Sequence, residues 1–377
     1  MYANYPKYSV RNILIDNNNW EKYKLFYRAE LKVYQIEEVD SMLLCNDPAN
    51  GFMVVHCQKC GDYTTHLSCN SRICPRCGNK YVKIWVEKIS ERMHDVDYSH
   101  IIFTLPRDIW NLIEGKWACI SELYKETFKV LKETMCQSAK QRINPGMINA
   151  GHTFGKDIKW NVHFHTICTE GGLTKNNLWK RVYYLPYRIM RFKWKQYSLA
   201  VIERHIGLDE QAQSVLEAVY HQYNNGFDIR RIKGKVQKKE LAGYIARYIR
   251  HPAISNRRII EYDRKRVVIV CENKETKRIQ YEEFTVEEFI ARLVRHIPPK
   301  GFQVVRHYGI YSKRKYVKNK LLKDKQEIIP KYSGEKHYIK CWKCGGYAEI
   351  IFFYSPYYAR KPPPEKQFGI KITDWIS

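Results

Sequence analysis

Two histidines separated by one phenylalanine form the pattern with the clearest chemical meaning in this sequence. His163 and His165 lie in an apolar stretch at 161–169 that has the composition of a β-strand. Residues two apart on a strand face the same side, so the two imidazoles would point together. Because imidazole nitrogens bind divalent metals, we expect these histidines to share a metal ion. His152, in the preceding strand-like segment, is the first candidate for a third ligand.

Two tyrosines four residues apart, Tyr244 and Tyr248, could supply a nucleophile. They lie in a segment expected to be helical from 238 to 250, where this spacing puts both on one face. A phenol, with a pKa of about 10, is a weak nucleophile unless cations favour the phenolate or a metal activates its target. Since the chain has 29 tyrosines, two ordinary aromatics at helical spacing are the alternative. The basic side chains expected to bind nucleic-acid phosphates here are Lys239, Arg247, Arg257 and Arg258.

Clustered cysteines predict a structural zinc site. Two short CxxC turns, each followed by glycine, would together supply four thiolates to a tetrahedral Zn²⁺ ion, and these ligands are Cys57, Cys60, Cys74 and Cys77. Cys69, His56 and His66 lie close by, so one of these residues could replace one of the four cysteines as a ligand. A further pair, Cys341 and Cys344, is half a site that could recruit His337 or another distant ligand, or bind nothing.

The composition favours a nucleic-acid partner and a metal-binding rather than a disulfide-bonded protein. Lys and Arg number 65 against 39 Asp and Glu, which gives a net charge of +26 and a potential that attracts polyanions. Aromatic residues interleaved with basic ones, as at 192–195, suit single-stranded nucleic acid, because bases stack on the rings. No segment approaches the roughly 20 apolar residues of a membrane span, and the start of the chain does not have the pattern of a signal peptide. We therefore expect a protein of the reducing cytoplasm, associated with the nucleoid and with no membrane partner.

The apolar patterns place these residues on alternating strands and helices. Buried strands are expected at 99–106, 147–154 and 161–169, and helices at 20–39, 107–142 and 176–223. Short strands and basic helices are expected at 255–335, and the three prolines at 362–364 predict an extended tail.

Taken in order, these features resemble the rolling-circle insertion-sequence transposases of the HUH (His–hydrophobe–His) endonuclease superfamily. The resemblance rests on the cysteine segment 72–78, the strand 100–106, the histidine pair with the glycines at 171–172, the tyrosine pair with 253–258, and the segments 288–292, 296–302 and 306–309. It implies an α+β fold, with an HUH nuclease core of antiparallel sheet flanked by helices, an N-terminal helical segment and a small zinc-binding domain. The expected regions are 1–50 (helical), 51–95 (zinc-binding), 96–255 (nuclease core), 256–335 (basic DNA-binding extension) and 336–377 (C-terminal segment with CxxC).

The resemblance also implies a chemistry. A tyrosine would attack one DNA strand with the help of Mg²⁺ or Mn²⁺, leaving a 5′-phosphotyrosine and a free 3′-hydroxyl, and the reverse reaction would join the end to a new strand. The partner would be single-stranded DNA of element ends and target, bound with the help of the zinc unit.

One departure and two alternatives accompany this interpretation. Many relatives carry glutamine where this chain has Lys156, which cannot act as a metal ligand while protonated, so His152 becomes the expected third ligand. The alternatives are a plasmid or phage rolling-circle replication initiator and a non-catalytic, zinc-dependent DNA-binding regulator. The sequence leaves open the oligomeric state, the DNA sequences recognised and which tyrosine attacks first.

Overall fold

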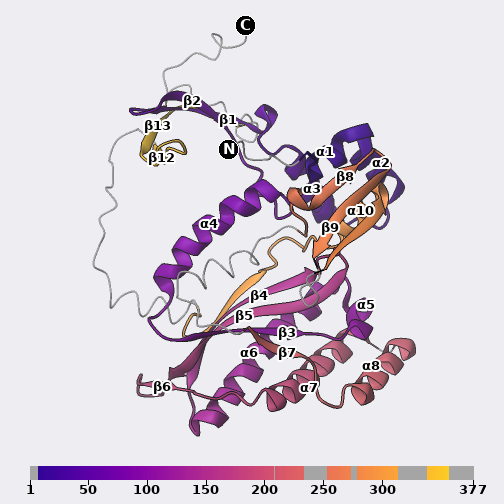
Figure 1. Cartoon of the computed structure of the whole chain (residues 1–377), viewed down its shortest axis with the longest axis vertical. Coiled ribbons are helices and arrows are strands. Elements are labelled where there is room, and N and C mark those ends of the chain that lie inside the picture. The colour runs from indigo at the N-terminus through magenta and orange to yellow at the C-terminus, as the bar shows by residue number, and fades with distance from the viewer. Residues whose placement is uncertain (1–6, 208, 233–252, 273–277, 313–337, 356–377) are drawn as a thin grey trace.

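An antiparallel sheet lies at the centre of the structure (Figure 1). His152, His163 and His165 lie on two of its paired strands. The computed structural model describes residues 7–207, 209–232, 253–272, 278–312 and 338–355. In the central sheet, the strand order is β11-β4-β5-β3-β7, and β6 pairs with β5. The strands are β3 (Tyr98–Thr104), β4 (Asn144–Phe154), β5 (Trp160–Leu173), β6 (Trp179–Arg181), β7 (Ile229–Ile232) and β11 (Val305–Gly309). With the helices that flank it, this sheet confirms the expected α+β class and is consistent with an HUH core.

One face of the central sheet is covered by a layer of helices (Figure 1). These are α5 (Trp110–Ile113), α6 (Trp117–Ala139), α7 (Tyr187–Ile206) and α8 (Glu210–Gln222). Val162 and Phe164 of β5 belong to the same buried cluster as Leu123 of α6 and Trp194 of α7. Because side chains alternate along a strand, the residues between them, including His163 and His165, face the opposite side.

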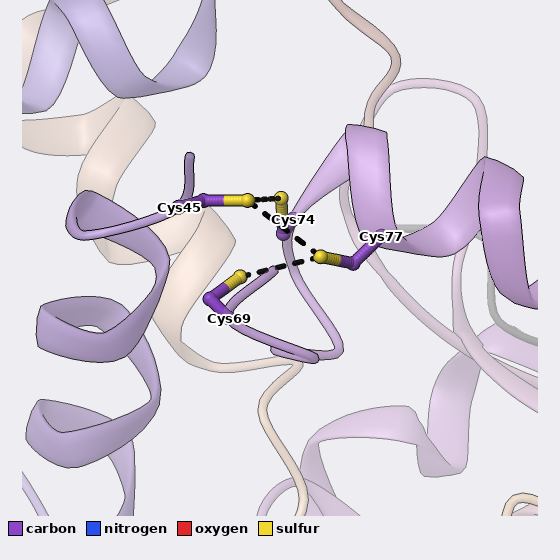
Figure 2. A group of neighbouring side chains, drawn as sticks. All are labelled: Cys45, Cys69, Cys74 and Cys77. Atoms are coloured by element: carbon purple, nitrogen blue, oxygen red, sulfur yellow. Dashed lines mark hydrogen bonds between the residues drawn. The ribbon is translucent and has the colours of Figure 1, made fainter. Parts of the chain in front are cut away.

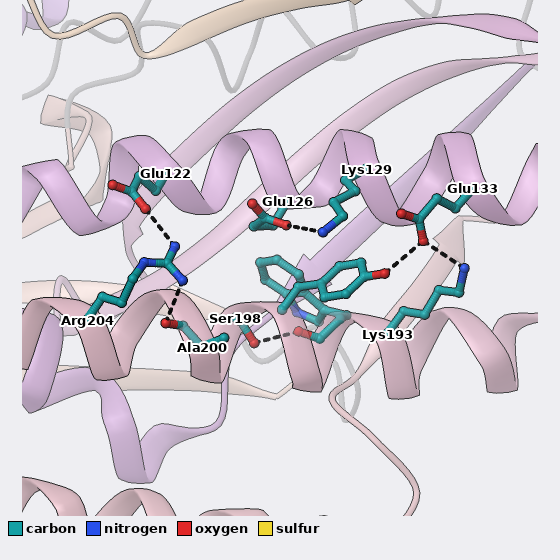
Figure 3. A network of polar contacts seen from close by, with 10 residues as sticks. Glu122, Glu126, Lys129, Glu133, Lys193, Ser198, Ala200 and Arg204 are labelled. Carbon is teal, nitrogen blue, oxygen red and sulfur yellow. Dashed lines mark hydrogen bonds and ion pairs between the residues drawn. The ribbon is translucent and has the colours of Figure 1, made fainter.

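Polar contacts join α6 and α7 along their length (Figure 3). Glu133 of α6 accepts hydrogen bonds from Lys193 and from the hydroxyl of Tyr197, both at 2.8 Å. Glu122, nearer the start of α6, pairs with Arg204 at 2.9 Å. Partly exposed ion pairs add little stability individually, so we assign them the role of fixing how the two helices align.

The opposite face of the central sheet packs against α4 (Pro75–Arg92). Ile148 and Ile167 form a buried cluster with Trp85 and Ile89 of this helix. The histidines therefore lie on the α4 face of the sheet, beside this apolar contact.

A second unit combines the N-terminal helices with a later part of the chain. Its elements are α1 (Val10–Ile15), α2 (Asn19–Phe26), α3 (Val33–Leu43), β8 (Ile259–Tyr262), β9 (Arg266–Glu272), β10 (Ile279–Thr285) and α10 (Val286–Val294). Residues of 10–45 and 253–297 share one buried cluster, so the regions expected at 1–50 and 256–335 pack together. The helix expected at 20–39 is two helices, because Lys32 has an extended conformation and starts α3, with its backbone N–H donating to the side-chain oxygen of Gln35 at 2.9 Å.

Another sheet joins an early and a late segment of the chain. Its strand order is β12-β13-β1-β2, with β1 (Phe52–Cys57), β2 (Gly61–His66), β12 (Tyr338–Lys340) and β13 (Tyr347–Tyr354). β1 pairs antiparallel with β13 from Phe52 opposite Tyr354 to His56 opposite Glu349. The segments expected to form separate regions at 51–95 and 336–377 thus contribute strands to one sheet.

Two further expectations can be compared with the described residues. The start of the segment 176–223, expected to be helical, contains β6, while α7 and α8 follow as expected. The helix expected at 238–250 lies outside the described residues. Short 3₁₀ turns complete the structure at Asp16–Asn18, Pro48–Asn50, Arg107–Ile109 and Asn256–Arg258. Among the described helices, none has the length and apolar character needed to cross a membrane.

Candidate functional site

Three histidines converge on the α4 face of the central sheet. His152 of β4 lies directly opposite His163 of β5, and Ala150 lies opposite His165, so neighbouring strands bring the three side chains together. One potential ligand atom from each lies within 4.8 Å of the others. The ring centroids of His152 and His165, and of His163 and His165, are 5.0 Å apart. We call these three residues the histidine triad.

Local hydrogen bonds orient the rings of the triad. Nδ1 of His163 lies 3.0 Å from the carbonyl oxygen of Asn161, to which it can donate. The pairing of β4 with β5 becomes irregular between His152 and Phe154, and the two rings stack with centroids 5.2 Å apart. His152 and His165 are buried, while His163 is half-buried, so the triad reaches the surface through His163.

A fourth histidine, His100, contacts the triad and was missed by the sequence analysis. It lies on β3, the strand next to β5, and its Nε2 is 3.2 Å from Nδ1 of His165. The two rings are nearly parallel, with centroids 5.3 Å apart. Its position at the start of the predicted strand 99–106 could have marked His100 as a candidate. Only the pairing of β3 with β5 shows that it contacts His165.

The hairpin that carries the triad is held by a buried histidine from outside it. His296, just after α10, contacts the Thr153 hydroxyl at 3.1 Å and the Ile158 carbonyl oxygen at 3.0 Å, and it stacks on Trp160. Burial is the main reason why the pKa of His296 is lowered to about 4. The neutral ring donates from Nε2 to Ile158 and accepts at Nδ1 from Thr153, which joins α10 to the end of the hairpin.

Of the predicted tyrosine nucleophiles and basic DNA contacts, only Arg257 and Arg258 lie among the described residues. Tyr244, Tyr248, Lys239 and Arg247 lie outside the described residues. Arg257 is exposed. The guanidinium of Arg258, in contrast, donates to the carbonyl oxygens of Lys156 and Val270, and its burial lowers its pKa. These internal bonds argue against a direct contact of Arg258 with DNA.

The cysteines are not grouped as the sequence analysis expected. Cys74 and Cys77 meet Cys45 and Cys69, whereas Cys57 and Cys60 meet Cys341 and Cys344. The expected set of Cys57, Cys60, Cys74 and Cys77 is therefore wrong. The physical reason is strand pairing: β1 and β2 form a sheet with β12 and β13, which brings the first CxxC turn to the last one.

The first tetrad, Cys45, Cys69, Cys74 and Cys77, lies between the end of α3 and the start of α4 (Figure 2). Sγ atoms in this tetrad are 3.5 to 3.6 Å apart. Four sulfurs around Zn²⁺ at about 2.3 Å would lie about 3.8 Å apart, whereas a disulfide bond is only about 2.0 Å long. The tetrad thus has nearly the dimensions of a tetrahedral zinc site, and all four cysteines are free thiols.

Electrostatics in the first tetrad favour a bound cation. Hydrogen bonds from Cys69, Cys74 and Cys77 hold the pKa of Cys45 well below its usual range. Hydrogen bonding to Cys45 raises the pKa of Cys69 and of Cys74. Without a cation the four sulfurs share protons through these hydrogen bonds, and a divalent ion would allow all four to ionise.

Two family models match this chain. Residues 146–319 match a model described as a putative transposase, and residues 15–105 match the transposase zinc-binding domain. The first range contains the whole histidine triad, and the second contains the whole first tetrad. The second match and the cysteine geometry together support a structural zinc ion.

Two curated relatives are also described as transposases. The chain is 25% identical over 331 residues to the transposase for insertion sequence element IS801 of Pseudomonas savastanoi pv. phaseolicola, covering 82% of this chain and 78% of that protein. It is 27% identical over 320 residues to the putative transposase y4qJ of Sinorhizobium fredii, covering 78% and 79% respectively. Comparison with solved structures gave no match.

Proposed function

This chain belongs to the IS91-type transposases, which carry an N-terminal zinc-binding domain, and we propose that it cuts and rejoins single-stranded DNA in rolling-circle transposition through a covalent tyrosine intermediate. The observation that carries the proposal is the histidine triad, whose potential ligand atoms lie within 4.8 Å of one another inside the region matched by the transposase model.

The donor atoms of the triad suit a divalent metal ion. Nδ1 of His163 faces the Asn161 carbonyl oxygen and Nδ1 of His165 faces His100, so we assign Nε2 of both rings to the metal. Three imidazoles are softer than the all-oxygen ligand sets that Mg²⁺ prefers, which favours Mn²⁺ over Mg²⁺ at this site. Such an ion would polarise the scissile phosphate and make its phosphorus more electrophilic.

Tyr244 and Tyr248 are the proposed nucleophiles. The phenolic oxygen attacks the phosphorus, the bond from phosphorus to the 3′-oxygen breaks, and the phenolic proton is taken up by the departing oxygen or by solvent. The products are a 5′-phosphotyrosine and a free 3′-hydroxyl. Attack by a 3′-hydroxyl on the phosphotyrosine reverses the chemistry and releases the tyrosine. One phosphoester replaces another at each step, so no ATP is needed.

The proposed partner is single-stranded DNA of the element ends and the target. The net charge of +26 supports a polyanionic partner. We further propose that the first tetrad holds the structural zinc and that the zinc-binding domain helps to bind element ends. A place in the cytoplasm, at the nucleoid, follows from such a substrate.

A covalent-trapping assay tests the proposal. The chain is incubated with Mn²⁺ and single-stranded oligonucleotides from both ends of the element that encodes it, labelled at the 3′ end so that the label stays with the 5′-phosphotyrosine. We expect a labelled adduct that survives denaturation and is absent from the Tyr244→Phe/Tyr248→Phe double variant. Tyr183→Phe, at an exposed position, is the matched control and should form the adduct normally.

Three outcomes separate the alternatives. An undiminished adduct in the His163→Ala/His165→Ala variant would rule out the metal assignment. Nicking at a plasmid or phage origin, without transfer of element ends into a second oligonucleotide, would indicate a replication initiator. DNA binding that is unaltered in the double tyrosine variant, with no adduct in either protein, would indicate a regulator.

A further inference from the structure

The second cysteine tetrad joins parts of the chain that lie far apart in sequence. Cys57 is the last residue of β1 and Cys60 lies in the turn after it, while Cys341 and Cys344 follow β12. One ligand atom from each cysteine lies within 4.8 Å of the others, and Sγ of Cys57 is 3.7 Å from Sγ of Cys344. That spacing is close to the roughly 3.8 Å edge of a Zn–sulfur tetrahedron and far from the length of a disulfide bond.

Each CxxC turn of this tetrad is followed by a glycine in the same backbone conformation. The glycine after each turn, Gly61 or Gly345, has a positive φ, of 71° and 77° respectively. Apart from each glycine's own chain neighbours, no heavy atom of the described residues lies within 4 Å of the position that a Cβ would take at either glycine. The glycines are therefore needed for their backbone conformation, which turns the chain into the following strand, and not because space is short. Two equivalent turns that face each other are the usual construction of a two-knuckle zinc site.

The surroundings also suit a tetrathiolate metal centre. Cys57 and Cys341 are buried, Cys60 is half-buried and Cys344 is exposed, so the site has a closed inner side and an outer side through which a metal can enter. Lysines within the two turns, Lys59 and Lys343, place positive charge beside four thiolates whose zinc complex would carry a charge of about −2.

We propose that Cys57, Cys60, Cys341 and Cys344 form a second structural zinc site, which makes the sheet β12-β13-β1-β2 a single zinc-stabilised unit. This site differs from the first tetrad in that half of its ligands lie beyond both regions matched by the family models, 15–105 and 146–319. Four sulfur ligands leave no open coordination position on the zinc ion. Its role is therefore to hold the β1–β2 and β12–β13 hairpins together and not to act on DNA.

Zinc content in a variant cycle tests the site directly. The full-length chain carrying His163→Ala/His165→Ala, which removes zinc binding at the triad, is purified with a reductant and its zinc is measured by mass spectrometry. We expect two zinc ions per chain. Cys57→Ser/Cys60→Ser and Cys341→Ser/Cys344→Ser should each leave one, and the quadruple variant should also leave one, because both pairs bind the same ion. Cys136→Ser, a half-buried cysteine outside both tetrads, is the control and should retain two.

The proposal fails if the C-terminal pair variant retains both zinc ions, or if the quadruple variant loses more than either pair variant. It also fails if a disulfide links Cys57 to Cys344 in zinc-free protein purified with a reductant. Should a variant aggregate, alkylation of the unaltered chain gives a second readout. Exposed Cys344 should resist alkylation until a chelator is added, and the four cysteines should then become reactive together. Rapid alkylation of Cys344 in the zinc-loaded chain would contradict the site.

Discussion

At the scale of single residues, the contact of His100 with His165 bears on the proposed metal site. A metal on Nε2 of His165 requires the proton on Nδ1, which then donates to Nε2 of His100 at 3.2 Å. In the proposed site, His100 would therefore act as a positioning residue that fixes the tautomer and the ring plane of His165.

Replacing His100 should weaken metal binding without removing a ligand. We expect His100→Ala to bind Mn²⁺ on the order of 10–100-fold more weakly in a calorimetric titration. His100→Gln keeps an acceptor and should recover part of the loss. His205→Ala, on α7 at the other face of the sheet, is the control. Equal affinity in His100→Ala and the unaltered chain would show that the contact has no such role.

Stability should depend on pH through His296. The pKa of its buried imidazole is about 4, against 6.5 for an ordinary histidine, because of burial first and then the charges of Arg295 and Arg292. Between these values the unfolded chain binds more protons, so this contribution to stability is present above about pH 6.5 and is lost as the pH falls to about 4. The loss would reach about 3 kcal/mol.

Urea unfolding at pH 7.5 and pH 5 measures this effect. His296→Gln can still donate to the Ile158 carbonyl oxygen but cannot titrate, so its stability should fall less over the same interval. If both proteins lose equal stability, His296 is not the responsible group.

At the scale of elements, the start of α10 connects a local sequence signal with the site. Thr285 Oγ1 accepts from the Glu288 amide at 3.1 Å, and the Glu288 carboxylate accepts from the Thr285 amide at 2.9 Å. This capping box begins the helix that ends just before His296. We expect Thr285→Ala to lower the free energy of unfolding by about 1 kcal/mol and Thr285→Ser to restore most of it, as measured by urea denaturation. A cost in the alanine variant that serine does not recover would point to lost packing instead.

The elements also explain which features the sequence could predict. Period-two alternation along a strand is a local rule, so the shared side of His163 and His165 could be predicted from spacing alone. The grouping of the cysteines could not, because the CxxC turns look alike locally and the choice between them depends on β1 pairing with β13. Cys45 stands alone after α3 and gives no local signal. Arg258 shows a further limit, since a basic side chain chosen for its charge is used in internal hydrogen bonds.

At the scale of the whole molecule, the first tetrad lies in a core shared by distant parts of the chain. Cys45, Cys74 and Cys77 belong to the same buried cluster as residues from 253–297. We expect a strong zinc chelator to lower the melting temperature and to increase hydrogen exchange in 10–45 and 259–294 together, while β4 and β5 remain protected. Added Zn²⁺ should restore both. Loss of protection at 10–45 alone would show that this helical segment opens independently. The same measurement on His163→Ala/His165→Ala separates this effect from loss of metal at the triad.

The helix α4 fixes both the distance and the angle between the first tetrad and the central sheet. It is 18 residues long, about 27 Å, with Cys74 and Cys77 at its start and Trp85 and Ile89 on the central sheet farther along. A single continuous helix transmits rotation as well as distance. One residue inserted between these two contacts would turn the cysteines by about 100° relative to the sheet, whereas four would return them to within about 40°. The number of residues between the two cysteines and the sheet contacts is therefore constrained by angle, and insertions of different length should differ in their tolerance even where every cysteine is kept.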